Sequence, residues 1–396
     1  MLKAERSRPR AGLCAALLLL GLLGGLPAAA RSADTDAERD LVSALALLQS
    51  GDSAAAIRTI GDLLQRKPEF RLAQLAYAEA LAARSGIPGV LADDADPRLQ
   101  ELIEEARLRQ RQAGFSPPPG SLPHTVLQLA EEYPHLVLVD LPNARLHLFE
   151  NRRGELRLLR SHYAAMGKNG FGKQVEGDNR TPVGIYHVTG WLDDRTLPDL
   201  YGAGALPLNY PNLWDRFQAK TGYGIWLHGV PRNTYVRAPR SSEGCVTMAN
   251  EDLEALRPYT VASRAPVVLS DTVEWIPAEE ARRRRERFAA RVEAWRRDWA
   301  SRDTAAYLAH YGDDFTTAGM DKAAFAAHKR RVNAGKQFIK VSIGDLSLFR
   351  YPGEDLYLAE FTLDYQSDNY RFRAKKEQYW KPDARGEWKI FREENR

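Results

Sequence analysis

Cysteine is scarce in this sequence, whose 396 residues contain only two, Cys14 and Cys245. This scarcity excludes a fold held together by a framework of disulfide bonds, and any zinc site built from cysteine pairs. The sequence also lacks a His-Glu-Xaa-Xaa-His motif, a phosphate-binding loop with Walker spacing, and metal-ligand spacing among the histidines other than His228. We therefore expect no metal ion and no cofactor.

A strong excess of one charge is also missing. The chain has 56 lysine and arginine residues against 52 aspartate and glutamate residues, a formal net charge of +4. Residues 1–30 hold four basic residues and one acidic residue, which leaves a net charge of about +1 for residues 31–396. This balance gives no reason to expect a nucleic-acid partner.

Apolar runs long enough to span a membrane are absent too. The longest, residues 11–26, has 16 residues, whereas a membrane-spanning helix needs about 20. It follows the basic residues 1–10 and precedes a proline and three alanines, an order typical of a secretory signal peptide. We expect a signal peptide over residues 1–30, cut near Ala30, and an exported protein of the periplasm or cell envelope. An uncleaved anchor is the alternative.

Residues 35–115 have the period of amphipathic helices. Apolar residues share one helical face over residues 41–48, and the spacing recurs over residues 56–64 and 72–81. This pattern resembles a single tetratricopeptide-like unit, which cannot form a solenoid alone. We expect a small helical domain or a dimerisation arm, so that a homodimer is one candidate assembly. A packing lead-in to the next domain is the alternative.

The apolar period changes to two after a proline-rich linker, which predicts a strand-rich domain over residues 122–275. The predicted strands cover residues 137–140, 145–149, 156–163 and 184–189. Residues 191–223 interrupt this rhythm and are rich in glycine, proline, asparagine and tyrosine. Long irregular stretches of this kind often form lids or binding loops.

The third segment, residues 280–396, begins with a helical pattern and continues with alternating strands. Phe288, Val292, Trp295 and Trp299 share one helical face, and strands are predicted from residue 339 onward. Helices followed by a curved antiparallel sheet are an α+β order. The pattern resembles the cone-shaped nuclear-transport-factor-2-like (NTF2-like) fold.

The residues that could carry chemistry lie in the middle segment. Cys245 would be the only thiol left after export, in a compartment where cysteines usually pair, so it is a candidate reactive thiol. It follows Gly244, which tolerates unusual backbone angles and allows close approach. His228 follows an apolar strand, and an imidazole can supply the thiolate that a cysteine nucleophile needs. A lone cysteine is more often a small buried hydrophobe, which is the alternative.

His228-Gly229, a gap, and then Ser242-Glu243-Gly244-Cys245-Val246 together resemble the catalytic motif of the L,D-transpeptidases (YkuD type). The histidine and the cysteine are 17 positions apart. Upstream, residues 139–148 resemble the family's opening strands, and residues 177–186 resemble its Thr-Pro-Xaa-Gly segment. The resemblance covers residues 135–272.

The resemblance implies a β-rich catalytic domain acting on peptidoglycan stem peptides. Cys245 would attack the L,D bond before a terminal D-alanine, and an amine of a second stem or of a lipoprotein, or water, would resolve the thioester. His228 would be the general base, Gly229 would orient it through its carbonyl, and the Gly244 backbone would belong to the oxyanion hole. Four further residues are expected to bind substrate: Asn209, Tyr210, Ser242 and Glu243.

Two positions depart from the commonest family pattern. Glu243 stands where a histidine is usual, and Thr247 stands where an arginine is common. Both departures leave the nucleophile and the base intact, so they bear on the choice of acceptor.

The predicted fold class is multidomain: a small α-helical N-terminal part, a β-rich L,D-transpeptidase-like domain and an α+β NTF2-like C-terminal domain. This order resembles the cell-shape-determining L,D-carboxypeptidases of helical bacteria. An L,D-transpeptidase is the first expectation. An L,D-carboxypeptidase that uses water as acceptor is the alternative, and a non-catalytic cell-wall binding protein is the alternative of another class.

Overall fold

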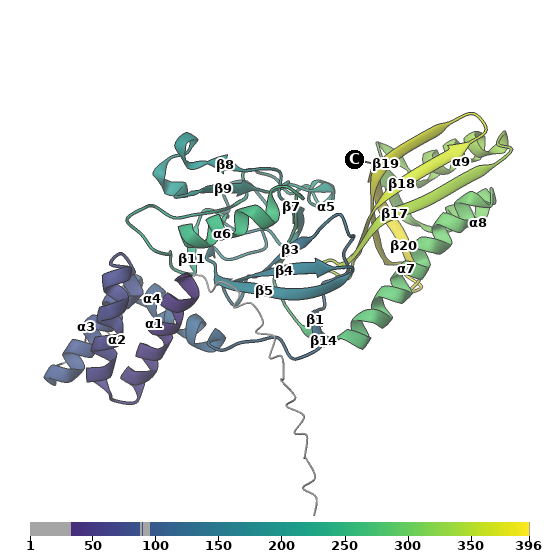
Figure 1. Ribbon diagram of the computed structural model, residues 1–396. Coiled ribbons are helices and arrows are strands. Elements are labelled where there is room, and N and C mark those ends of the chain that lie inside the picture. Colours follow the sequence, from purple (N-terminus) through teal and green to yellow (C-terminus); the bar gives the residue numbers. More distant parts are fainter. Residues whose placement is uncertain (1–32, 88, 90–95, 396) are drawn as a thin grey trace, which may run out of the picture. The chain divides into compact units, whose positions relative to one another are not determined.

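The computed structural model describes residues 33–87, 89 and 96–395 (Figure 1). The expected signal peptide and Cys14 lie outside the described residues. Within these ranges no helix is both long enough and apolar enough to cross a membrane.

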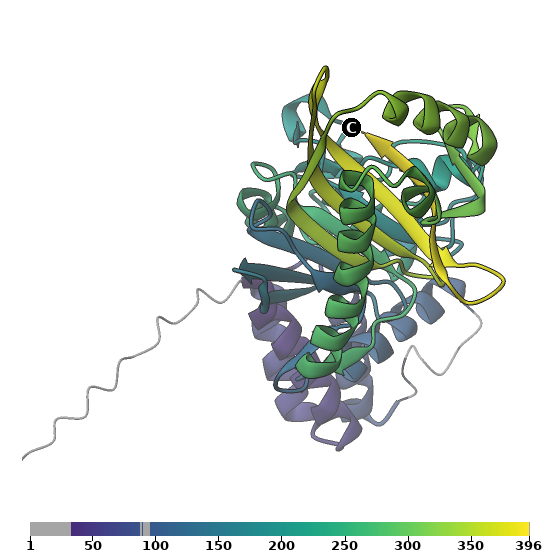
Figure 2. The ribbon, with the colours of Figure 1, turned by 90° about the vertical axis from the view of Figure 1, so that its right-hand side faces the viewer.

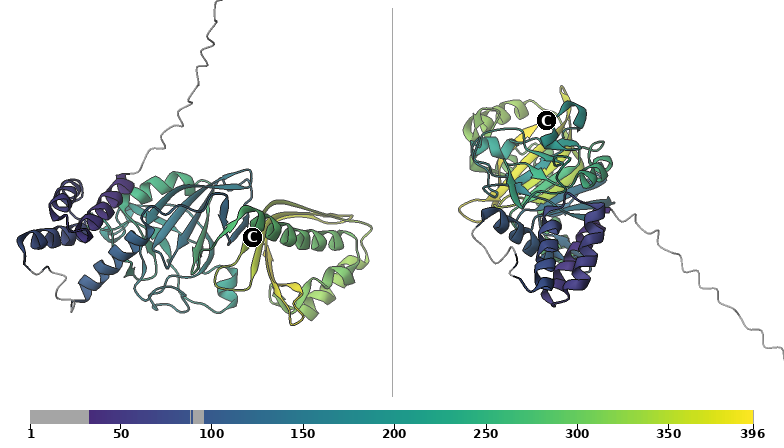
Figure 3. Two further views of the ribbon diagram at one scale, coloured as in Figure 1. Left: turned by 90° about the horizontal axis from the view of Figure 1, so that it is seen from below. Right: turned by 90° about the vertical axis from the view of Figure 1, so that its left-hand side faces the viewer.

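Four helices form the N-terminal part, α1 (Ala33–Gln49), α2 (Ser53–Arg66), α3 (Arg71–Ser85) and α4 (Pro97–Gln112). Helices α1 and α2 pack against each other, as do α2 and α3 (Figures 1 and 3). The first three helices confirm the apolar periodicity. Helix α4 was not expected, because its exposed face is so rich in arginine, glutamate and glutamine that the apolar period is weak. Its start nevertheless carries a recognisable signal, since Asp96 caps the helix and Pro97 follows at the first turn.

A buried ion cluster fastens this helical part to the central strands. Glu38 of α1 accepts hydrogen bonds from Arg109 of α4, at 3.0 Å, and from Arg145 of the central segment, at 2.8 Å. Glu105 pairs with the same Arg109 at 2.8 Å, and both side chains are buried. Buried charges are stable only when they are paired in this way, so the cluster fixes the helices on the β-rich segment.

Two sheets face each other in the β-rich segment. The larger has the strand order β5-β4-β3-β13-β7 and the smaller the order β12-β10-β9-β8. Their facing side chains form one core that includes Val137, Leu146, Leu206, Leu227 and Val267. The strands of the larger sheet are β3 (His135–Asp140), β4 (Arg145–Arg152), β5 (Glu155–Tyr163), β7 (Gly184–His187) and β13 (Pro266–Ser270); those of the smaller are β8 (Leu192–Asp193), β9 (Gly204–Pro207), β10 (Trp226–His228) and β12 (Val246–Thr247).

The remaining elements of this segment connect the sheets and cover their ends. Strand β6 (Met166–Gly167) pairs with β11 (Arg240–Ser242), and β1 (Ser121–Pro123) pairs with β14 (Trp275–Pro277). Helix α6 (Asn250–Thr260) follows β12. The predicted strands are thereby confirmed as β3, β4, β5 and β7.

The C-terminal part is a curved sheet with helices along it, antiparallel except for one parallel pair, residues 311–317 with residues 388–395. Helix α7 (Ala278–Ala300) packs on strand β17 (Ile339–Arg350) (Figures 1 and 2). Its Trp295 is buried in one core with Trp380 and Phe361. The other elements are α8 (Thr304–Leu308), β15 (Tyr311–Thr317), β16 (Met320–Asp321), α9 (Lys322–Ala334), β17 (Ile339–Arg350), β18 (Tyr357–Ser367), β19 (Arg371–Pro382) and β20 (Trp388–Asn395). This arrangement confirms the α+β expectation.

One strand from outside this segment joins its sheet. Strand β2 (Val126–Gln128), which precedes the first strand of the β-rich sheets, pairs with β17 at Leu348 and Phe349. The two paired strands are more than 200 positions apart along the chain, so local sequence periodicity gives no sign of their pairing.

Residues 191–223, expected as an irregular lid, contain β8, β9 and the short helix α5 (Leu213–Phe217). Trp214 of α5 stacks on Tyr379 of β19 with ring centroids 5.5 Å apart, and its indole N–H donates to Glu354 at 2.8 Å. The Asn212 amide donates to the Tyr351 hydroxyl at 2.8 Å. This part of the expected lid is therefore fastened to the C-terminal sheet.

Candidate active site

His228 is the last residue of β10, a strand that lies between β9 and β12 in the smaller sheet. Its ring is buried, and Nδ1 lies 2.7 Å from the carbonyl oxygen of Gly229. A carbonyl can only accept, so Nδ1 carries the proton and Nε2 of the neutral ring keeps its lone pair. The Gly229 carbonyl thus fixes the tautomer of His228.

Cys245 directly precedes β12, the parallel neighbour of β10. Leu227 pairs with Val246 and His228 pairs with Thr247. Side chains alternate between the two faces of a strand, so Cys245 and His228 lie on the same face of the sheet, diagonal to each other on adjacent strands. The Cys245 thiol donates to the carbonyl of Gly224 at 3.4 Å. The sheet register therefore places Cys245, directly before β12, one strand away from His228.

A tight turn sets the position of the thiol. The Ser242 hydroxyl accepts from the Gly244 N–H at 3.1 Å and donates to the Cys245 carbonyl at 2.5 Å. Gly244 has φ +124°, and a Cβ at this position would come within 2.9 Å of the Arg180 carbonyl oxygen, so only glycine fits. In this structure the Gly244 N–H, expected in an oxyanion hole, and the buried Ser242, expected to bind substrate, both hold the turn.

Burial decides the charge state of the pair. It raises the pKa of the Cys245 thiol to about 11, although a hydrogen bond from the Trp226 backbone and the positive charges of Arg237 and Lys173 act in the opposite direction. Burial likewise lowers the pKa of His228 to about 4, against the hydrogen bond to Gly229. Both groups are therefore neutral at pH 7.

Arg237 and Tyr201 also belong to this site, although no sequence motif identifies them. The Tyr201 ring meets the His228 ring edge-on, with centroids 5.0 Å apart. Arg237 is half-buried, and its positive charge lowers the pKa of Cys245. The only sequence signal for Arg237 is its place in the polar stretch between His228 and Cys245.

A loop over residues 167–181 lies against the cysteine turn. The Lys168 N–H donates to the Ser242 carbonyl at 2.7 Å, and the Gly167 N–H donates to the Thr181 hydroxyl at 2.9 Å. This loop includes part of the segment that resembled the family's Thr-Pro-Xaa-Gly motif, so the sequence did mark it.

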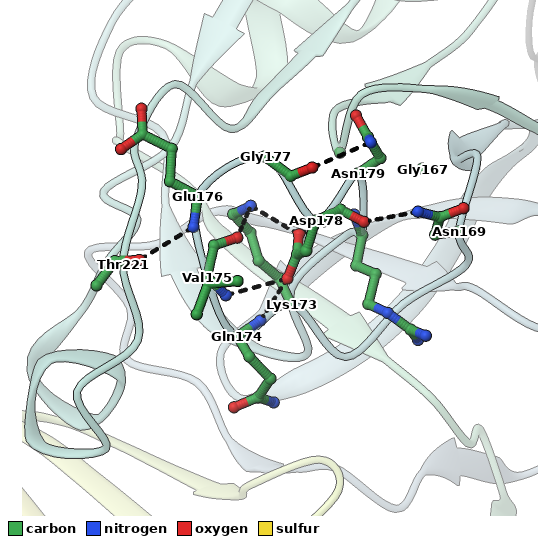
Figure 4. Close-up of polar contacts among 12 residues, drawn as sticks. Gly167, Asn169, Lys173, Gln174, Val175, Glu176, Gly177, Asp178, Asn179 and Thr221 are labelled. Carbon is green, nitrogen blue, oxygen red and sulfur yellow. Dashed lines mark hydrogen bonds and ion pairs between the residues drawn. The ribbon is translucent and has the colours of Figure 1, made fainter.

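Asp178 organises this loop, as Figure 4 shows. Its carboxylate accepts from the backbone N–H of Gln174 at 2.7 Å and from the ammonium of Lys173 at 2.9 Å. Burial alone would raise the pKa of Asp178, but these and further backbone hydrogen bonds hold it at about 2. The Glu176 N–H donates to the Thr221 hydroxyl at 3.0 Å, which ties the loop to the residues after α5.

The other residues expected to bind substrate differ in their surroundings. The Glu243 side chain is 87% exposed and lies 4.0 Å from the Lys168 ammonium, a pairing that solvent weakens. Asn209 accepts from the His187 N–H at 2.7 Å, and the buried Tyr210 donates to the Thr221 carbonyl at 3.1 Å. Asn209 and Tyr210 thus hold backbone segments in place, whereas Glu243 faces solvent beside the turn.

Comparison with known proteins identifies the same regions. A model of the L,D-transpeptidase catalytic domain matches residues 134–269, and a model of the Cds6 C-terminal NTF2-like domain matches residues 287–394. No curated protein sequence matches the chain significantly.

Two solved structures resemble the chain over more than two thirds of its length. Bd1075 from Bdellovibrio bacteriovorus is 30% identical with a TM-score of 0.62, and the match covers 69% of this chain and 98% of Bd1075. The helical cell shape determining protein Pgp2 from Campylobacter jejuni is 27% identical with a TM-score of 0.58, and the match covers 68% of this chain and 95% of Pgp2. These matches confirm the predicted architecture, and we conclude that the chain belongs to the L,D-transpeptidase family, with an NTF2-like domain following the catalytic domain.

Proposed function

We propose that this peptidoglycan-active member of the L,D-transpeptidase family is a cysteine acyl-enzyme that releases D-alanine from tetrapeptide stems. The observation that carries the proposal is the placement of Cys245 and His228 on one face of two parallel neighbouring strands, with His228 Nδ1 held by Gly229. A nucleophile beside a base, which a third group orients in turn, is the arrangement that covalent catalysis needs.

In the first half-reaction, the Cys245 sulfur attacks the carbonyl carbon of the stem's third residue. His228 Nε2 takes the thiol proton as the sulfur–carbon bond forms, and it gives that proton to the nitrogen of D-alanine as the carbon–nitrogen bond breaks. D-alanine leaves as a free amino acid, and an acyl-thioester remains on Cys245. Because the resting pair is neutral, this proton transfer takes place during the attack and not before it.

In the second half-reaction, an acceptor attacks the thioester, and two acceptors suit this chemistry. An amine of a second stem, or of a lipoprotein, gives a transpeptidase product, which is the activity in the name of the matching family model. Water gives a tripeptide stem, as in an L,D-carboxypeptidase. The match to the helical cell shape determining protein Pgp2, over 95% of that protein, supports water, because the sequence resemblance links cell-shape-determining proteins to L,D-carboxypeptidases.

The decisive experiment supplies purified tetrapeptide muropeptides to the protein, with and without an excess of D-amino acid or a second stem. Release of D-alanine is expected in every condition. Tripeptide as the sole product assigns the carboxypeptidase, whereas exchanged or cross-linked product assigns the transpeptidase. A protein that binds muropeptides without releasing D-alanine would be the non-catalytic cell-wall protein, and the proposal would be wrong.

Two variants test the assignment of the residues. Cys245→Ala should abolish D-alanine release and the covalent adduct with a carbapenem, which intact-mass spectrometry detects. His228→Ala should keep the fold and lose about 10²–10⁴-fold in acylation rate, the usual contribution of a general base. Retention of turnover by a folded Cys245→Ala protein would contradict the mechanism.

A substrate of this kind implies a location. Stem peptides belong to the cell wall, so we propose that the protein works in the periplasm or cell envelope. Localisation of the full chain by cell fractionation tests this.

A further inference from the structure

A cavity of about 450 Å³ lies between the helical N-terminal part and the loop that leads to the cysteine turn. Its helical wall includes Arg71, Arg98 and Glu101, and its opposite wall includes Thr234, Arg237 and Ser241. Arg237 belongs both to this cavity and to the surroundings of Cys245, whose pKa it lowers. Ser241 of the cavity wall directly precedes Ser242, whose hydroxyl donates to the Cys245 carbonyl, so the cavity adjoins the turn that carries the proposed nucleophile.

Arg237 is a half-buried cation, and the largely exposed Glu243 carboxylate raises its pKa only from beyond ion-pair distance. Among the described residues Arg237 forms no ion pair with a carboxylate. Its guanidinium donates one hydrogen bond there, to the Leu200 carbonyl at 3.2 Å. A guanidinium has five N–H donors. Taking a charge out of water is costly unless it is paired, and partial burial already lowers the pKa of Arg237. An anionic group entering the cavity would supply the missing partner.

The other charged groups of the cavity do not cancel this positive charge. Glu105 is buried against Arg109 at 2.8 Å, and Arg98 pairs with Asp96 at 2.8 Å. Glu101 is then the one unpaired carboxylate among the lining residues, against Arg71 and Arg237, while the largely exposed Glu243 lies outside the lining. The cavity thus favours a carboxylate ligand, which arginine binds through two parallel hydrogen bonds.

We propose that this cavity is the leaving-group side of the active site, where Arg237 binds the C-terminal carboxylate of the stem peptide and Arg71 of the helical part adds positive charge. The inference rests on the proposed function, since the carboxylate of a terminal D-alanine lies only one residue beyond the bond that Cys245 attacks. It gives the helical part a role in substrate selection: stems that end in a free carboxylate directly after the scissile bond are preferred.

The test measures equilibrium binding to the full chain carrying Cys245→Ala, so that no turnover intervenes. The probes are two synthetic tetrapeptide stems that end in D-alanine and in D-alaninamide. A hydrogen bond between two charged groups is stronger than one to a neutral amide, so the acid should bind at least about tenfold more tightly than the amide. Arg237→Gln should remove this preference, Arg237→Lys should restore part of it, and Arg71→Gln should reduce it to a smaller extent.

Arg232→Gln is the matched control, because Arg232 lies on the same loop, is largely exposed and pairs with Asp194. It should leave the ratio of the two affinities unchanged. If folded Arg237→Gln protein keeps the wild-type ratio, or if neither peptide binds, the proposal is overturned. Turnover by the unsubstituted protein is measured separately. If the protein releases D-alanine but Arg237→Gln keeps the wild-type ratio of the two affinities, only the carboxylate site is rejected. If the acid peptide is preferred but no D-alanine is released, only the proposed function is rejected.

Discussion

The protonation state of Cys245 is the most informative quantity to measure in this site. With a pKa of about 11, against an ordinary value of 9.0, the thiol is ionised in about 1 of 10,000 molecules at pH 7, where an ordinary thiol would be ionised in about 1 of 100. Only the thiolate reacts with an alkylating agent. Cys245 should therefore be alkylated by iodoacetamide about 100-fold more slowly than a free thiol at the same pH.

The assay uses a Cys14→Ser chain, so that Cys245 is the only thiol, and follows adduct formation by intact mass from pH 6 to 11. The same protein unfolded in urea is the matched reference, because unfolding removes the burial that raises the pKa. The folded protein should still gain reactivity above pH 9, whereas the unfolded one should level off near its ordinary pKa.

His228→Ala distinguishes a neutral resting pair of Cys245 and His228 from a preformed thiolate–imidazolium pair. Since His228 has a pKa of about 4 and is neutral, its removal should change the alkylation profile little, yet it should slow acylation by a carbapenem about 10²–10⁴-fold. A wild-type inflection below pH 8 that disappears in His228→Ala would show a preformed thiolate–imidazolium pair. That result would refute the neutral resting state and the proton transfer derived from it.

Four further predictions follow from the geometry around the site. D-alanine release should persist from neutral pH down to about pH 5 and fall as the pH approaches 4, because the base form of His228 is lost as pH falls through its depressed pKa; a loss centred near pH 6.5 in the pH–rate profile would contradict this. Gly244→Ala should cost about 1–3 kcal/mol in strain and lower the rate of D-alanine release more than tenfold, whereas Gly154→Ala, also at positive φ but with open space around it, should leave that rate unchanged. Asn250→Ala removes the three hydrogen bonds that hold the backbone of Ala203 and Val230 beside Gly229, so kcat should fall while KM changes little, and Asn250→Asp, which keeps the accepting oxygen, should fall less. Trp214→Ala should lower the free energy of unfolding by about 3–5 kcal/mol in a urea titration, because a buried ring stacked on Tyr379 is lost; a change below 1 kcal/mol would show that α5 is not fastened to the C-terminal sheet.

The local sequence was sufficient to predict the features that depend on apolar periodicity and on short motifs. Alternating apolar residues predicted β3, β4, β5 and β7, and the helical period predicted α1, α2, α3 and α7. The pair His228 and Cys245 stood out because Cys245 would be the only thiol after export and because both residues match the motif of the L,D-transpeptidases. These features depend on residues close together in the chain, so a reader of the sequence can see them.

The tertiary structure decided what depends on contacts between distant residues. Pairing of β10 with β12 places the thiol and the imidazole on one face, and burial is the main cause that moves their pKa values to about 11 and about 4. Arg237 enters the site because its loop packs between the helical part and the cysteine turn, which no periodicity encodes. Strand β2 joins β17 across more than 200 positions, and α5 is fastened to β19, for the same reason. The sequence determined the elements and the reactive residues, while packing determined their charge states, their neighbours and the cavity beside them.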